Sequence, residues 1–115
     1  MTDISLPAQS EVKIDIHLTA RLNVTDFTAQ RRVSKLLLDQ VGNLLYGERP
    51  TLLVGRRLLW RVPVWFGRPP DGPIGQVGHL DVDAQTGEIL YSQLDLNLFA
   101  ERGNALARRS ASAAS

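Results

Sequence analysis

The chain has no cysteine among its 115 residues, which excludes disulfide bonds and thiolate metal sites. It has no apolar run near the roughly 20 residues that span a bilayer, and no basic segment followed by the apolar run of a secretory signal. Thirteen basic residues against twelve acidic ones leave a formal net charge of +1, so bulk charge does not favour a polyanion. These absences predict a cytoplasmic protein without a membrane segment, for which nucleic acid is not the expected partner.

The length fits a single domain, and the hydrophobic residues, 43% of the chain, suffice for one modest core. Residues 1–10 are polar and contain a proline, which predicts a loose N-terminus. Residues 11–18, EVKIDIHL, alternate between apolar and polar side chains, as does a half-buried strand or a segment that pairs with a partner. We therefore expect one α+β domain over residues 11–92, followed by a weak helix and a disordered tail over residues 93–115.

One long helix is predicted directly after Thr25, whose side chain can cap the first turn. Apolar residues recur there at intervals of three and four as far as Leu45, as along the buried face of a helix of about five turns. Gly47 is placed to end this helix in the left-handed conformation, and Pro50 prevents a restart. The sequence thus predicts an amphipathic helix with one buried face.

Beyond this helix the hydrophobic period changes to that of a strand. TLLV is short and apolar, residues 58–66 alternate almost without error, and residues 76–83 and 88–92 flank an AQTG turn. Pro63 cannot donate a ladder hydrogen bond, which predicts a sheet edge or a bulge there. Residues 67–75 are rich in proline and glycine and predict a turn-rich connection. The expected fold class is therefore α+β, with one long amphipathic helix packed on a three- to four-stranded antiparallel meander and a weak C-terminal helix.

Three acidic residues around the AQTG turn, Asp81, Asp83 and Glu88, raise the question of a metal or acid–base site. An EF-hand loop needs glycine at its sixth position and a bidentate glutamate at its twelfth, whereas this stretch has its glycine seventh and Ser92 twelfth. A hairpin explains more residues, because Asp83 can accept backbone hydrogen bonds in the turn and Gly87 supplies positive φ. With two distant histidines and no nucleophile-elbow or phosphate-loop motif, we expect no catalytic residues, metal ligands or cofactor, and no enzyme activity.

The alternation in residues 58–66 separates a wholly apolar side, which includes Trp60, from a side that carries Arg61 and Trp65. Neighbouring tryptophan and arginine residues are typical of interface hot spots. If the predicted helix covers the Trp60 side, either the C-terminal tail or another protein covers the Trp65 side, and the sequence leaves both alternatives open. Further basic residues follow near the end of the chain. The candidate partner-binding residues are therefore Arg61, Trp65, Arg102, Arg108 and Arg109.

Two resemblances to known families rest on these stretches. Residues 77–90, VGHLDVDAQTGEIL, resemble the strand–turn–strand ending of PepSY-type domains, in which a VD-x-x-TGE hairpin recurs. A longer series between Val24 and Leu90 comprises RRVSKLLLDQV, PTLLVG, WRVPV and GQVGHLDVD. This series resembles small uncharacterised prokaryotic proteins associated with neighbouring PIN-domain ribonuclease toxins.

The second resemblance implies an antitoxin-like protein that neutralises a PIN-type ribonuclease toxin by binding it, and it brings no catalytic residues. A PIN-type active site is an acidic metal pocket, so the resemblance implies a block by Arg102, Arg108 or Arg109 presented from the tail. The alternative function is a PepSY-like or cystatin-like module that binds a peptide or inhibits a peptidase, and a small nucleic-acid binder ranks last. A homodimer through the strand with Pro63 and the Trp65 side is the other assembly that the sequence allows.

Overall fold

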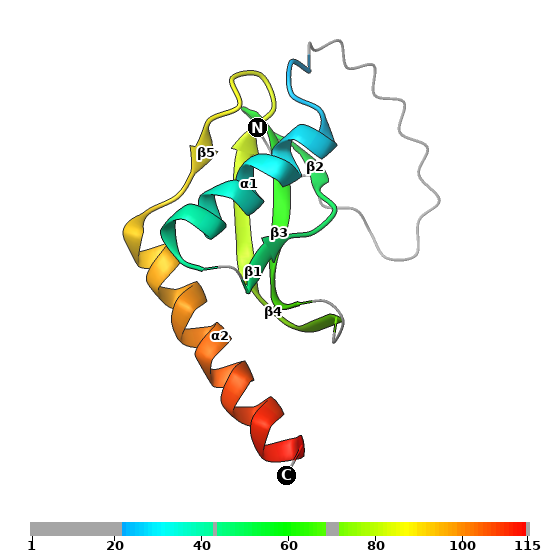
Figure 1. The fold of residues 1–115 in the computed structure, drawn as a ribbon. Coiled ribbons are helices and arrows are strands. Elements are labelled where there is room, and N and C mark those ends of the chain that lie inside the picture. The colour runs from blue at the N-terminus through cyan, green and yellow to red at the C-terminus, as the bar shows by residue number, and fades with distance from the viewer. Residues whose placement is uncertain (1–21, 43, 69–71, 115) are drawn as a thin grey trace, which may run out of the picture.

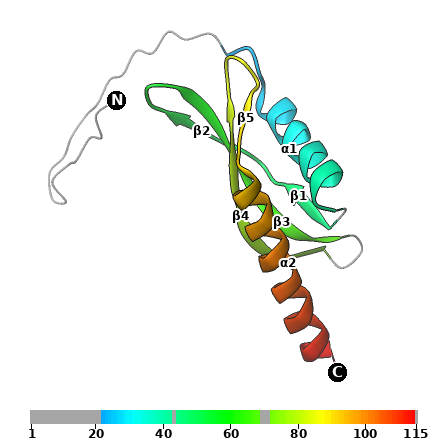
Figure 2. The same cartoon turned by 90° about the vertical axis from the view of Figure 1, so that its left-hand side faces the viewer.

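The computed structural model describes residues 22–42, 44–68 and 72–114, so the predictions for residues 1–10 and 11–18 lie outside the described residues. One antiparallel sheet carries both helices on one side (Figures 1 and 2). The predicted α+β fold class is confirmed. The elements in chain order are α1 (Asp26–Gln40), β1 (Leu45–Gly47), β2 (Thr51–Val54), β3 (Leu58–Arg68), β4 (Gly72–Asp83), β5 (Ile89–Leu90) and α2 (Gln93–Ala114).

Strand β3 is the centre of the sheet. It pairs with β4 from Leu59 opposite Asp83 to Arg68 opposite Gly72, and β4 in turn pairs with the short β5. On its other side β3 pairs with β2 near its start and with β1 near its end. Strands β1 and β2 therefore share one position of the sheet, which is why five strands fill the four positions of the predicted meander.

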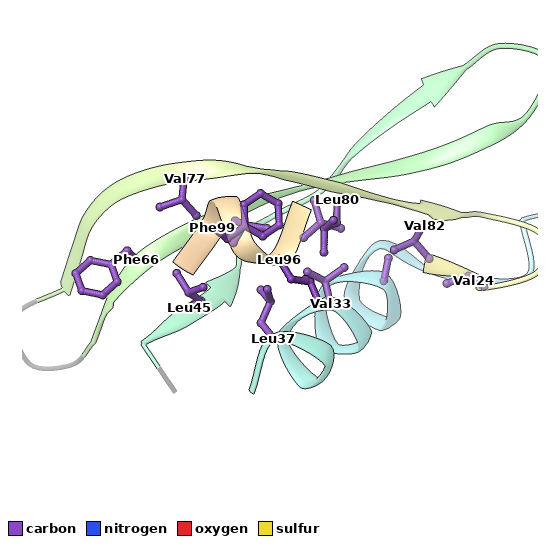
Figure 3. Close-up of a cluster of buried hydrophobic side chains, with 13 residues drawn as sticks. Val24, Val33, Leu37, Leu45, Phe66, Val77, Leu80, Val82, Leu96 and Phe99 are labelled. Atoms are coloured by element: carbon purple, nitrogen blue, oxygen red, sulfur yellow. The ribbon is translucent and has the colours of Figure 1, made fainter. Parts of the chain in front are cut away.

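The core lies between the sheet and the two helices (Figure 3). As the alternation in residues 58–66 predicts, Val62, Val64 and Phe66 of β3 are buried there. Both helices contribute to the same cluster, which makes it one continuous core rather than two. The cluster consists of Val24, Ala29, Val33, Leu37, Leu45, Val62, Val64, Phe66, Val77, Leu80, Val82, Leu96 and Phe99.

Helix α1 begins as predicted but ends earlier. Thr25 caps it by accepting a hydrogen bond from the Thr28 amide, and the helix ends at Gln40. The predicted end at Gly47 is wrong, because Gly47 belongs to β1 and lies directly against α1. Its N–H donates to Ser34 Oγ (2.9 Å), and a Cβ at this position would come within 2.8 Å of Val62 Cγ1. Gly47 therefore allows a close approach of strand and helix, and does not cap a helix.

Helix α2 is longer than the sequence predicts. Ser92 and Asp95 form a reciprocal cap at its start, in which the Ser92 amide donates to Asp95 Oδ2 and the Asp95 amide donates to Ser92 Oγ. The helix then continues for 22 residues through Gly103 to Ala114. The disorder expected for residues 110–114 is therefore not observed. Because α2 packs on the same side as α1, the tail does not cover the Trp65 side of the sheet.

Pro63 lies in the central strand and pairs in register with His79, so the prediction of a sheet edge is wrong, and the bulge lies in the partner strand β4 and not at Pro63. A register shift against β4 occurs between Val64 and Trp65, one residue further on. The Pro63 carbonyl accepts from the Glu48 amide (2.8 Å), and the N–H position of a strand residue points to the same side as its carbonyl. The position where Pro63 lacks an N–H therefore faces the gap between β1 and β2, where no strand residue needs a donor from it. Strands also extend into the predicted connection of residues 67–75, since β3 ends at Arg68 and β4 begins at Gly72.

Candidate partner-binding site

The side of the sheet opposite the helices is the candidate site, and we call it the outer sheet face. Paired residues of neighbouring strands point to the same side, so the register assigns its members. Both helices lie on the other side, and no described helix or strand covers this one (Figure 2). The outer sheet face consists of Tyr46, Thr51, Leu53, Leu59, Arg61, Pro63, Trp65, Gln76, His79, Asp81, Asp83 and Leu90.

Aromatic side chains gather at one end of the outer sheet face. Tyr46 of β1 is the register partner of Trp65 of β3, and both are partly exposed. Trp65 also lines a hollow of about 260 Å³ together with Glu48, Arg49 and Pro73. Partial burial, together with the nearby carboxylate of Glu48, raises the pKa of Tyr46. The phenol therefore stays protonated at neutral pH and can donate a hydrogen bond beside Trp65.

An ion pair occupies the middle of the outer sheet face. Arg61 donates from Nε to Asp81 Oδ1 (3.0 Å) and from Nη2 to Asp81 Oδ2 (3.1 Å). The Arg61 side chain remains 43% exposed, so the pair contributes at most about 1 kcal/mol to stability. Its effect is to hold the guanidinium flat in one orientation. A partner would therefore meet a fixed and neutralised arginine, two residues along β3 from Pro63 and four from Trp65.

The C-terminal arginines lie elsewhere. Arg102 donates from Nη1 to the carbonyl of Val77 (2.6 Å), which ties α2 to β4. This carbonyl needs a partner because Val77 is an extra residue in β4, opposite the register shift between Val64 and Trp65. Sequence reasoning missed this contact, since nothing local marks the bulge except the nearby Gly75 and Gly78.

Arg108 and Arg109 are exposed on the end of α2 that projects beyond the sheet (Figure 1). The structure therefore brings Arg61 and Trp65 together on one strand, and separates them from the three arginines of α2. Each of the two groups must be tested separately, because no single contact surface holds all five predicted residues.

The acidic residues of the β4–β5 turn form a structural cluster. Asp83 is buried, and its Oδ1 accepts from the amides of Gln85 (2.8 Å) and Thr86 (2.9 Å) while its Oδ2 accepts from Arg57 Nη2 (2.7 Å). Gly87 has a φ of 81°, as the hairpin prediction requires. Over residues 22–42, 44–68 and 72–114, no three histidine or acidic side chains converge as ligands for a metal ion. The sequence predicted the turn bonds of Asp83 but missed its pairing with Arg57.

This cluster predicts a pH dependence of stability. The bond from the Thr86 amide, then Arg57 and the Gln85 amide, lower the pKa of Asp83 from 3.8 to about 2. A carboxylate with a lowered pKa stabilises the fold fully above pH 3.8, and this contribution is lost as the pH falls towards 2. We expect Asp83→Asn to lower the free energy of unfolding by about 2 kcal/mol at pH 7 and by much less near pH 2. Urea denaturation at both pH values measures the difference.

The exposed Glu101 of α2 provides the control for this prediction. Glu101→Gln should leave the free energy of unfolding within about 0.5 kcal/mol of the wild type at both pH values. A loss of stability in Asp83→Asn that is equally large at pH 7 and near pH 2 would contradict the role assigned to the charged carboxylate.

The chain matches no protein-family model, and no curated protein or solved structure is significantly similar to it. Among the described helices, none combines the length and the apolar character needed to cross a membrane. The features that bear on function are therefore the outer sheet face, the exposed end of α2 and the resemblances of the sequence stretches.

Proposed function

We propose that this chain is a non-catalytic protein-binding module and that the outer sheet face is its contact surface. The observation that carries the proposal is the asymmetry of the sheet: two helices bury one side, while the other side keeps Tyr46, Pro63 and Trp65 partly exposed. Tryptophan, tyrosine and arginine are the residues that contribute most to binding at protein interfaces. A partner that covers Trp65 would exclude water from this aromatic end and from the Arg61–Asp81 pair.

The proposed partner is a PIN-type ribonuclease, which makes the chain antitoxin-like. This part of the proposal rests on the resemblance of the stretches between Val24 and Leu90 to proteins associated with PIN-domain toxins. The position of Arg108 and Arg109 supports it, because an exposed helix end presents two guanidinium groups without the entropic cost of ordering a loose segment. Arg102 is less suited, since it already donates to the Val77 carbonyl. We therefore assign the block of the acidic pocket to Arg108 and Arg109, as a second contact separate from the outer sheet face.

Co-purification with the product of the adjacent gene tests the proposed function. The tagged chain should form a stable complex with that protein and inhibit its RNA hydrolysis. A chain that neither binds the adjacent gene product nor inhibits its activity would refute the antitoxin-like function.

The double variant Arg108→Ala/Arg109→Ala tests the assignment of the inhibitory residues. Both side chains are exposed, so the free energy of unfolding should stay within about 0.5 kcal/mol of the wild type. Inhibition should weaken by about tenfold or more, because each arginine would contribute charge-assisted hydrogen bonds to the acidic pocket. A truncation after Phe99 is a poorer test, because it also removes Arg102 and the contact of Leu106 with Gly75.

The matched control is Arg56→Ala, which removes an exposed arginine from the β2–β3 turn. Titration of RNA hydrolysis against each purified variant gives the inhibition constants. Full inhibition by the double variant, at the level of Arg56→Ala, would contradict the assignment of the two arginines.

A further inference from the structure

The edges of the sheet differ in how their backbone groups are satisfied. An unpaired strand edge exposes N–H and C=O groups that readily pair with another strand. On one side of β3 the sheet ends at β1 and β2, and on the other side it ends at β5 and at the part of β4 that β5 does not reach. The hydrogen bonds along β4, β1 and β2 therefore indicate which of these three strands can accept a further strand.

The edge of β4 is closed by side chains. The Val77 carbonyl accepts from Arg102 of α2 (2.6 Å), and the Gly78 carbonyl accepts from the Gln76 side chain (3.1 Å). Two register shifts interrupt the β3–β4 ladder, and α2 packs its Phe99 ring against Gly78. Bulges and a covering helix are features that protect a sheet edge from pairing.

The edge of β1 is closed by α1. At Gly47 the N–H donates to Ser34 Oγ (2.9 Å) and the carbonyl accepts from Gln30 Nε2 (3.1 Å). Two side chains of α1 thus take the place that a neighbouring strand would have. No further strand can pair here without displacing the helix.

Among the described residues, no helix or side chain protects the edge of β2 in this way. Within the described part of the chain, residues 51–54 make no hydrogen bond outside their ladder with β3. Leu52 and Val54 point to the side of the sheet that carries the helices, as do their register partners Trp60 and Leu58. Val54 is 41% exposed. Figure 2 shows β2 extending away from α1, which lies over the other end of this sheet position. Within residues 22–42, 44–68 and 72–114, the β2 edge therefore has backbone groups without a hydrogen-bond partner beside apolar side chains.

We propose that residues 11–18 of this chain occupy the β2 edge as an additional strand. Their alternation fits this position, because Val12, Ile14, Ile16 and Leu18 can share one side. That side would continue the apolar strip formed by Leu52 and Val54, while the polar residues between them point to the other side. The inference is independent of the proposed function, since it concerns how the chain closes its own sheet.

The position where the chain enters the described part supports this occupant. The amides of Asn23 and Val24 both donate to the Ala84 carbonyl at 3.0 Å, and Trp60 Nε1 donates to the Val24 carbonyl at 2.7 Å. Trp60 lies in β3 and is the register partner of Leu52 in β2. Its bond to Val24 therefore holds the start of the described chain close to the strand that pairs with β2.

The chain between Leu18 and Val24 is long enough to reach this edge. Six residues span up to about 20 Å when extended. A strand added beside β2 would lie about two strand spacings, or about 10 Å, from β3. The link can therefore bring residues 11–18 to β2 without disturbing the anchor at Val24.

Amide hydrogen exchange and NMR on the full chain test the proposal. The outward amides of residues 51–54 should be protected, and nuclear Overhauser contacts should connect residues 11–18 with β2. In Ile14→Pro/Ile16→Pro, which removes two backbone donors, these β2 amides should exchange about tenfold faster or more, while Val62 and Leu80 keep their protection. Asp3→Pro is the control and should leave the exchange of β2 unchanged.

Two results would overturn the proposal. One is the absence of contacts between residues 11–18 and β2, with equal exchange of residues 51–54 in both proline variants. The other is protection of β2 that rises with protein concentration in the wild type, because this would assign the edge to a second copy of the chain.

Discussion

Replacement of Phe99 by alanine should lower the free energy of unfolding by about 3–5 kcal/mol. Phe99 is 4% exposed and points into the buried cluster (Figure 3). Its ring packs closely on Gly78, where an added Cβ would lie 3.2 Å from Phe99 Cδ1. With Leu96 it is one of the two residues of α2 in the core cluster. Its truncation therefore leaves a cavity between α2 and β4 at the contact that holds the helix to the sheet. Urea denaturation at pH 7, followed by circular dichroism, gives the loss of stability.

Leu94 on the same helix is the matched control for Phe99. It is 73% exposed, so Leu94→Ala removes an apolar side chain from α2 without opening a cavity. The expected change in the free energy of unfolding is within about 0.5 kcal/mol. Equal losses for Phe99→Ala and Leu94→Ala would contradict the docking of α2 on the sheet through Phe99.

Replacement of Trp65 by alanine should weaken binding to the partner by about 30-fold or more, which corresponds to about 2 kcal/mol at an interface hot spot. Trp65 is the largest side chain of the outer sheet face and lies beside Tyr46 and the hollow that Glu48, Arg49 and Pro73 also line. Isothermal titration calorimetry with the product of the adjacent gene measures the dissociation constant. Circular dichroism verifies that the variant remains folded.

Phe27 provides the control for Trp65, since it is a 62% exposed aromatic residue on α1, on the other side of the sheet. Phe27→Ala should leave the dissociation constant within about twofold of the wild type, because it removes aromatic surface away from the proposed contact. A loss of affinity in Phe27→Ala that equals the loss in Trp65→Ala would contradict the assignment of the outer sheet face.

Local patterns were sufficient to predict the parts of the fold that local chemistry decides. The alternation in residues 58–66 predicted which side of β3 is buried, because side chains alternate along any strand. The turn at Asp83 and Gly87 was also predictable, because its hydrogen bonds join residues that are close in sequence. The α+β class followed from these elements and from the cap at Thr25.

Other features depend on contacts between residues far apart in the sequence. Leu44 and Leu45 continue the apolar spacing of α1, yet Leu45 lies in β1 because Gly47 packs against Ser34 and Val62. Gly103 lowers the intrinsic helix propensity of α2, but it is buried where a Cβ would lie 3.2 Å from Phe66. In both places the close approach of two elements determines the structure.

The candidate site was predictable to a similar extent. Arg61 and Trp65 follow from the alternation of one strand, whereas the pairing of Arg61 with Asp81 requires the β3–β4 register. Arg102 was expected to be available to a partner, but its bond to Val77 depends on a bulge that the sequence does not reveal. Arg108 and Arg109 remain predictions as partner-binding residues.

Fluorine NMR of the two tryptophans tests the central claim most directly. The chain is labelled with 5-fluorotryptophan, the unlabelled product of the adjacent gene is added, and the Trp60→Phe and Trp65→Phe variants assign the two signals. Trp60 is anchored on the inner side by its bond to the Val24 carbonyl and should keep its resonance in the complex. The resonance of Trp65 should shift or broaden on binding. A complex that forms while the Trp65 signal stays unchanged would contradict the claim that the outer sheet face holds the partner.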